Sequence, residues 1–325
     1  MKVGIMSFAH MHAYSYAKCL QQLPGVELIG IFDENMDRGK EASSQFNTKY
    51  FNDMDLFLLE EMDAVIVCSE NNRHKEMVVK AAYAKKQILC EKPLATNLQD
   101  AKEMIAVCKE NGVILQTAFP VRFSKAIREL KSLIDCGEIG EIVAMRTTNR
   151  GQNPGGWFID KEQSGGGAVL DHTVHMVDIM RWYLGKEIKE IFATVDCLFG
   201  LENIDDAGLL TIEFEDGTIA SHDTSWSRTS AYPSWGDATI EVIGTKRTVR
   251  VDAFGDMLKL YKDETEQKFS YVYAGKDIDL GLIGDFVSAV KDGKAPSISG
   301  YDGLKAMEAA LAAYKSSESG KPVTL

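Results

Sequence analysis

The sequence lacks the features that mark several classes of protein, and each absence argues against one class. No apolar run approaches the roughly 20 residues of a membrane-spanning helix. The N-terminus passes from Met1-Lys2 directly into a strand-like run, without the apolar core of a signal peptide. Basic residues are also few, since 36 Lys and Arg against 48 Asp and Glu give a formal net charge of −12. This charge argues against nucleic acid and anionic membranes as partners, because both require a basic face.

Cysteine is scarce and not clustered. The six cysteines are scattered without a C-x-x-C pair, and three lie in or beside apolar stretches, where cysteine behaves as a small hydrophobe. We therefore expect a reducing, cytoplasmic setting. His10, His12 and His74 have no carboxylate or cysteine at metal-ligand spacing along the chain, so we predict no metal site.

Hydrophobic patterning predicts an α/β fold with two domains, in line with a length of 325 residues. Over residues 1–120, short apolar runs alternate with helical stretches, which is typical of a Rossmann domain with a doubly wound parallel sheet. Residues 121–325 read differently, since most of the stretch from 187 to 273 is strand-like and helices precede and follow it. This half predicts an α+β domain with a large, mainly antiparallel open sheet, whose uncovered face favours a homo-oligomer, dimer or tetramer.

Parallel sheets bind ligands beyond the carboxyl ends of their strands. Asp33 follows the second strand, where a carboxylate binds the adenosine ribose and repels a 2′-phosphate, so NAD is preferred to NADP; Arg38 keeps NADP open. The turn of residues 7–12 lacks the fingerprint glycines. Ser7 and Ala9 are small enough for close approach, whereas His12 puts a bulky ring at the third glycine position. The candidate cofactor contacts are Ser7, Phe8, Ala9, His10, His12, Asp33, Ser69, Asn71, His74, Glu91 and Lys92.

Two further stretches carry reactive side chains. Gly165–Leu184 predicts a largely buried helix on which Asp171, His175 and Asp178 share one face; buried polar groups of this kind form ion pairs or do chemistry, and both readings stay open. Lys92 lies between Glu91 and Pro93 at the end of the fifth strand. An ammonium there could hold or polarise a substrate oxygen, and the alternative is a surface Lys-Pro turn.

These features in this order resemble the glucose–fructose oxidoreductase / inositol dehydrogenase (Gfo/Idh/MocA) family over essentially the whole chain. The residues that carry the resemblance are Glu91-Lys92-Pro93, Gly165-Gly166-Gly167 through Asp171 to His175, Ser69–His74, and Gly137-Glu138-Ile139-Gly140. The resemblance implies an NAD(P)-dependent dehydrogenase that acts on a CH–OH group of a sugar, inositol or related polyol. It makes Lys92 the catalytic lysine, His175 the proton donor or acceptor, and Asp171 the carboxylate that orients the histidine or grips a hydroxyl.

The same resemblance adds Arg122, Arg150, Trp157 and His172 to Lys92, Asp171 and His175 as expected substrate contacts. Two other functions stay open because the first turn lacks its glycines. One is a sugar- or cofactor-sensing regulator that keeps the dehydrogenase fold without catalysis. The other is an NAD-assisted sugar enzyme without net redox chemistry, for example one that cleaves a glycoside through a transient ketone.

Overall fold

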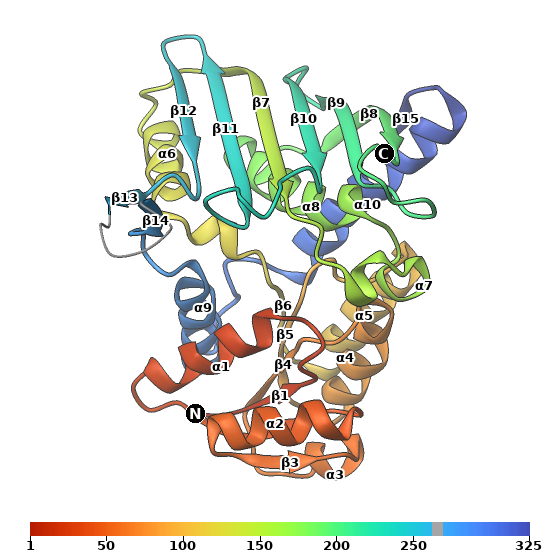
Figure 1. Cartoon of the computed structure of the whole chain (residues 1–325), viewed down its shortest axis with the longest axis vertical. Coiled ribbons are helices and arrows are strands. Elements are labelled where there is room, and N and C mark those ends of the chain that lie inside the picture. The colour runs from red at the N-terminus through yellow and green to blue at the C-terminus, as the bar shows by residue number, and fades with distance from the viewer. Residues whose placement is uncertain (262–268) are drawn as a thin grey trace. The chain divides into compact units, whose positions relative to one another are not determined.

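The structure is a computed structural model that describes residues 1–261 and 269–325 (Figure 1). The chain divides into two compact units. Unit 1 comprises Met1–Pro120, Glu162–Gly165 and Asp279–Lys305, and unit 2 comprises Val121–Lys161, Gly166–Ile278 and Ala306–Leu325. In the described part of the chain, no helix combines the length and apolar character needed to cross a membrane.

Unit 1 is built on a six-stranded sheet of order β3-β2-β1-β4-β5-β6, in which all neighbours are parallel. Its strands are β1 (Lys2–Met6), β2 (Glu27–Phe32), β3 (Lys49–Phe51), β4 (Ala64–Val67), β5 (Gln87–Cys90) and β6 (Leu115–Thr117). Its helices are α1 (His12–Gln22), α2 (Met36–Phe46), α3 (Met54–Leu58), α4 (His74–Tyr83), α5 (Leu98–Asn111) and nearly all of α9 (Ile278–Asp292). The predicted doubly wound parallel sheet is confirmed.

Local sequence explains how this sheet is covered. Position 4 in β1 requires glycine, because a Cβ there would lie 2.4 Å from the Phe57 ring of α3. Asn97 caps α5, since its side chain accepts from the N–H of Asp100. The strand order reverses between β1 and β4, which is the point where such sheets bind their ligands.

Unit 2 contains a seven-stranded sheet of order β12-β11-β7-β10-β9-β8-β15. Its strands are β7 (Ile142–Gly151), β8 (Ile188–Asp196), β9 (Ala207–Phe214), β10 (Ile219–Ser225), β11 (Gly236–Gly244), β12 (Thr248–Asp252) and β15 (Val323–Thr324). Neighbours are antiparallel except β7 and β10, which are parallel because α8 and two strands intervene between them. The predicted mainly antiparallel open sheet is confirmed. The strands β13 (Met257–Tyr261) and β14 (Phe269–Tyr273) instead form a separate pair.

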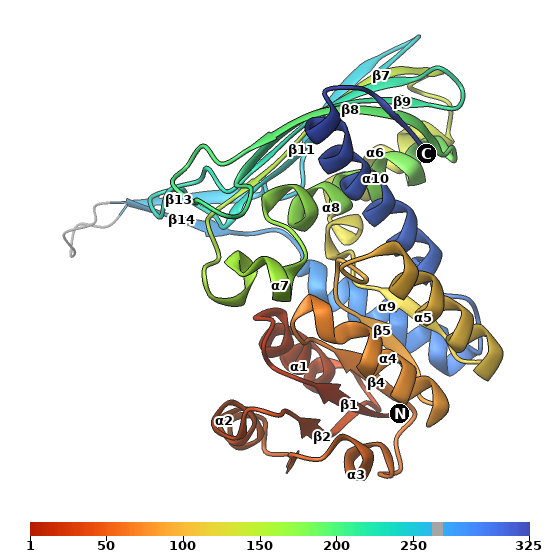
Figure 2. The same ribbon diagram turned by 90° about the vertical axis from the view of Figure 1, so that its right-hand side faces the viewer.

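Helices cover one face of this sheet and leave the other face uncovered (Figure 2). Helix α8 (Ala168–Leu184) packs on β7, β9 and β10 and is largely buried, as predicted for this apolar segment. The other helical segments are α6 (Lys125–Asp135), α7 (Lys161–Ser164), α10 (Gly300–Ser319) and the short 3₁₀ turns Asn71–Arg73, Pro120–Phe123 and Gly156–Ile159. The sheet therefore has a buried side that holds α8 and an opposite side that faces away from the helices.

Candidate active site

The turn after β1 keeps its shape through side chains rather than glycines. Ser7 has φ 72°, in the left-handed region that glycine adopts most easily. Its hydroxyl accepts from the N–H of Ala9 at 3.1 Å, and Asp33 Oδ2 accepts from the N–H of Phe8 at 2.8 Å. Ser7 and Asp33 thus stabilise a turn that a glycine fingerprint would otherwise form.

Asp33 is buried behind a guanidinium. Arg38 donates to both of its oxygens, from Nε to Oδ2 at 2.8 Å and from a terminal nitrogen to Oδ1 at 2.9 Å. Arg38 also lines a cavity of about 400 Å³, together with Ser7, Glu34, Asn35, Glu70, Asn72, Arg73, Met77 and Gln163. Asp33 itself is fully buried and does not line this cavity, so the predicted ribose-binding carboxylate is connected to the cavity wall through its ion pair with Arg38.

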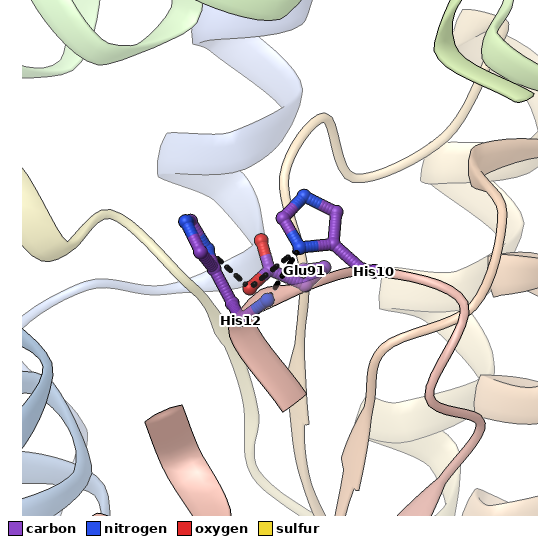
Figure 3. Close-up of side chains that lie close together, drawn as sticks. All are labelled: His10, His12 and Glu91. Atoms are coloured by element: carbon purple, nitrogen blue, oxygen red, sulfur yellow. Dashed lines mark hydrogen bonds and ion pairs between the residues drawn. The ribbon is translucent and has the colours of Figure 1, made fainter. Parts of the chain in front are cut away.

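His10, His12 and Glu91 gather beside this turn (Figure 3). Glu91 Oε1 lies 2.9 Å from His12 Nδ1 and 3.9 Å from His10 Nδ1. Burial acts to raise the pKa of the Glu91 carboxyl, but His10, His12 and Lys92 outweigh it, so the pKa lies well below its usual range. The expectation that no carboxylate accompanies these histidines missed Glu91, which the parallel sheet brings to the same edge although it lies 79 residues along the chain from His12.

Lys92 follows β5 and is buried, and its peptide bond to Pro93 is cis. The loops near it are held by two of the predicted cofactor residues. His74 is buried with Nδ1 3.0 Å from the Pro93 carbonyl and Nε2 3.3 Å from the Ser69 carbonyl, and burial lowers its pKa. Asn71 Nδ2 donates to the Ser164 carbonyl at 2.8 Å. His74 and Asn71 thus fix backbone segments around Lys92.

None of the three glycines at the start of α8 has room for a side chain, and a Cβ on Gly165 would lie 2.7 Å from the Cβ of Thr96. A Cβ on Gly167 would lie 1.8 Å from the carbonyl oxygen of Asp205, and one on Gly166 would lie 2.5 Å from the hydroxyl of Tyr314. The Asp205 carboxylate accepts from the N–H groups of Gly167 at 2.9 Å and Val169 at 2.8 Å. It satisfies donors that a helix N-terminus leaves without partners, and so fixes where α8 begins.

Asp171 and His175 lie one turn apart on α8, and both are buried. Asp171 Oδ2 accepts from Trp226 Nε1 at 3.3 Å and lies 3.2 Å from His172 Nε2. His172 Nδ1 lies 2.9 Å from the carbonyl oxygen of Asn149 in β7. The predicted substrate residues Asp171 and His172 therefore contact each other, while Trp226 is a neighbour that sequence reasoning missed.

The third residue of the predicted polar face has a structural role. Asp178 is buried and pairs through both oxygens with Arg122, with Arg122 Nε 2.8 Å from Oδ2. The ion-pair reading thus applies to Asp178 and accounts for Arg122. Arg150 lies in β7 with its Nε 3.2 Å from Asp223 Oδ2 on the neighbouring strand β10.

Trp157 contributes to the apolar surroundings of Asp171. Its ring stacks on Phe158 with 3.9 Å between centroids. Phe158 and Trp226 belong to one hydrophobic cluster, against which Trp157 packs. Trp226 therefore connects the aromatic residues to the Asp171 carboxylate through its indole N–H.

A parallel sheet whose strand order reverses between β1 and β4 defines unit 1 as a Rossmann-type nucleotide-binding domain. A family profile described as "Oxidoreductase family, NAD-binding Rossmann fold" matches residues 1–119, and one described as "GFO/IDH/MocA C-terminal domain" matches residues 127–250. The chain belongs to the Gfo/Idh/MocA family, as the sequence motifs predicted. It is an NAD-dependent dehydrogenase.

Individual relatives span the full length of the chain. Myo-inositol 2-dehydrogenase of Thermotoga maritima is 32% identical over 100% of this chain and 98% of its own. Scyllo-inositol 2-dehydrogenase (NAD(+)) of Bacillus subtilis is 29% identical over 100% of this chain and 96% of its own. The crystal structure of GenD2 from gentamicin A biosynthesis, in complex with NAD, superposes with a TM-score of 0.90 at 26% identity, covering 100% of this chain and 96% of that one.

Proposed function

We propose that the protein transfers a hydride between NAD and a secondary alcohol or ketone of an inositol, a sugar or a related polyol. The observation that carries this proposal is the buried Asp171–His175 pair on α8, on the face where Trp226 and His172 hold the carboxylate. Buried polar groups on an apolar helix require partners or chemistry. The relatives named as inositol 2-dehydrogenases support the substrate class.

The proposed chemistry gives each side chain one task. When bound, the nicotinamide of NAD would supply the acceptor for the hydride of the alcohol carbon. His175 takes the hydroxyl proton as the carbon–oxygen double bond forms, and it returns this proton in the reverse direction. Asp171 grips a substrate hydroxyl and stabilises the positive charge that His175 acquires. The Lys92 ammonium stabilises the negative charge that develops on the reacting oxygen.

A substrate screen tests this proposal. Purified protein is incubated with myo-inositol, scyllo-inositol, aldoses and sugar acids, each with NAD and with NADP, and the absorbance of the reduced nicotinamide is followed. We expect reduced NAD to accumulate with at least one polyol. Product without reduced NAD would favour the non-redox sugar chemistry, and binding of NAD and sugar without any product would favour a sensing regulator.

The Asp33–Arg38 pair gives a prediction about cofactor choice. Replacing Asp33 by asparagine keeps an acceptor for the Phe8 N–H and removes the charge that opposes a 2′-phosphate. Arg38 then pairs with that phosphate, so kcat/KM for NADP relative to NAD is expected to rise roughly 10- to 100-fold. Steady-state kinetics with both cofactors measures the ratio. Adding Arg38→Ala to this variant should abolish the gain, and an unchanged ratio in Asp33→Asn contradicts the prediction.

We also propose that the uncovered face of the seven-stranded sheet is the interface of a homo-oligomer. Phe192, Leu209 and Ile219 on β8, β9 and β10 are 44%, 60% and 56% exposed on that face. Exposed apolar side chains of this kind favour association. Light scattering is expected to give a mass of at least two chains, and Leu209→Asp should lower it; a monomeric wild type contradicts the proposal.

A further inference from the structure

The turn that follows β1 has already used most of its backbone donors. In a glycine-rich turn these N–H groups point at the diphosphate of a dinucleotide. Here they donate inside unit 1: Phe8 to Asp33 Oδ2 at 2.8 Å, Ala9 to Ser7 Oγ at 3.1 Å, His10 to the Cys68 carbonyl at 2.9 Å and His12 to His10 Nδ1 at 3.2 Å. Recognition of the diphosphate therefore has to come from side chains.

His12 is the side chain that the turn offers for this purpose. It is the first residue of α1, at the helix end that attracts anions. Its Nδ1 lies 2.9 Å from Oε1 of the fully buried Glu91, whereas its own side chain is 30% exposed. Figure 3 shows the other edge of the ring turned away from Glu91. With Nδ1–H donated to Glu91, the Nε2 position is the one that can meet a ligand.

The charges around His12 favour a protonated ring. Burial lowers the pKa of His12, but the charge of Glu91 and its hydrogen bond to the ring act together with Asp279 of α9 to bring the pKa above its ordinary value. Lys92 opposes the increase in this pKa. Two further neighbours face the ring: the Tyr16 hydroxyl at 3.3 Å from Nδ1, and His10 at 4.4 Å between ring centroids.

We propose that the His12 imidazolium, held by Glu91, binds the diphosphate of NAD through Nε2–H in place of the backbone N–H groups of a glycine-rich turn. This inference rests on the assignment of NAD as cofactor and adds the residue that recognises its phosphates. A charge-assisted hydrogen bond to phosphate is stronger than a neutral one, so one such contact can replace several weaker donors. Its strength then depends on the proton that His12 carries.

Binding of three ligands at several pH values tests the proposal. Calorimetry measures the Kd of NAD, ADP and adenosine between about pH 5.5 and 9, which is from about one unit below to about two and a half units above the pKa of an ordinary imidazole. For the wild type, the Kd of NAD and of ADP is expected to rise about tenfold as the pH passes through the raised pKa of His12, because the neutral ring loses its charge. Adenosine, which has no phosphate, should bind equally well throughout.

Two variants of His12 distinguish the effect of its charge on ligand binding from the effect of its shape. His12→Gln should weaken NAD and ADP at low pH by roughly 10- to 100-fold and remove the pH dependence, while adenosine binding stays unchanged. His12→Arg should bind NAD and ADP at every pH as the wild type does at low pH. Melting temperatures show whether each variant is folded. Equal weakening of adenosine in folded His12→Gln would indicate a distorted site and overturn the proposal.

Other outcomes overturn different parts of the argument. A wild type that binds NAD and ADP without pH dependence overturns the role of His12 and leaves the cofactor assignment in place. A wild type that binds neither overturns both. Titration with Zn²⁺, with EDTA as the control, tests whether the cluster binds a metal instead. If Zn²⁺ binds and its binding requires His10, His12 and Glu91, the cluster is a metal site and His12 is not the phosphate ligand.

Discussion

His175→Gln is expected to lower kcat for the proposed polyol substrate by roughly a thousandfold, because in the proposed mechanism His175 is the group that takes the hydroxyl proton. Glutamine has a similar size and keeps a polar end, so the packing of α8 should be retained. The Kd of NAD should stay within about twofold, since His175 acts on the substrate proton and not on cofactor binding. Steady-state kinetics and calorimetry on the same preparation measure the two effects.

His222 provides a matched control in the same unit. It is fully buried in β10 with Nδ1 2.8 Å from the Thr147 hydroxyl, and burial lowers its pKa to about 3. The ring is therefore neutral near neutral pH and does not change its protonation state there. His222→Gln should keep kcat within about threefold even where it lowers the melting temperature. A loss of activity in both variants that follows their stability would assign His175 to packing and contradict the prediction.

The sequence predicted the helices and strands whose hydrophobic pattern is contained within one short segment of the chain. Alternating apolar runs and helices predicted the parallel sheet, and glycines before a dense apolar segment predicted α8 and its packing on the second sheet. The three-residue strand β3 escaped because it is too short and too exposed to show a pattern. The parallel pairing of β7 with β10 also escaped, since pairing between strands far apart in sequence leaves no mark on either strand.

The same distinction applies to the candidate site. The spacing of Asp171 and His175 placed them on one helix face from sequence alone. The partners of these residues could not be read in the same way: Trp226 lies 55 residues from Asp171, and Arg122 lies 56 residues from Asp178. Contacts of this kind follow from which strands and helices become neighbours. These contacts show that Asp178 belongs to an ion pair, whereas Asp171 faces His172 and an indole N–H.

Lys92→Met is expected to lower kcat by roughly 100- to 1000-fold, because the substitution removes the ammonium that we propose stabilises the developing charge on the reacting oxygen. Methionine fills most of the space of the buried lysine side chain and lacks the ammonium with its charge and N–H donors. Lys92→Arg restores a charge but not the compact geometry of an ammonium, so it should recover only part of the activity. A kcat within about threefold of the wild type in Lys92→Met would assign Lys92 to a structural role.

The double variant Lys92→Met/His175→Gln asks whether both side chains act on one hydroxyl. If Lys92 and His175 serve the same proton transfer and charge change, removing the second after the first has little left to remove. The loss of kcat in the double variant should then be close to the loss in the less active of the two single variants. A loss equal to the product of the two single losses would mean that the residues act in independent steps, and would contradict a shared reacting oxygen.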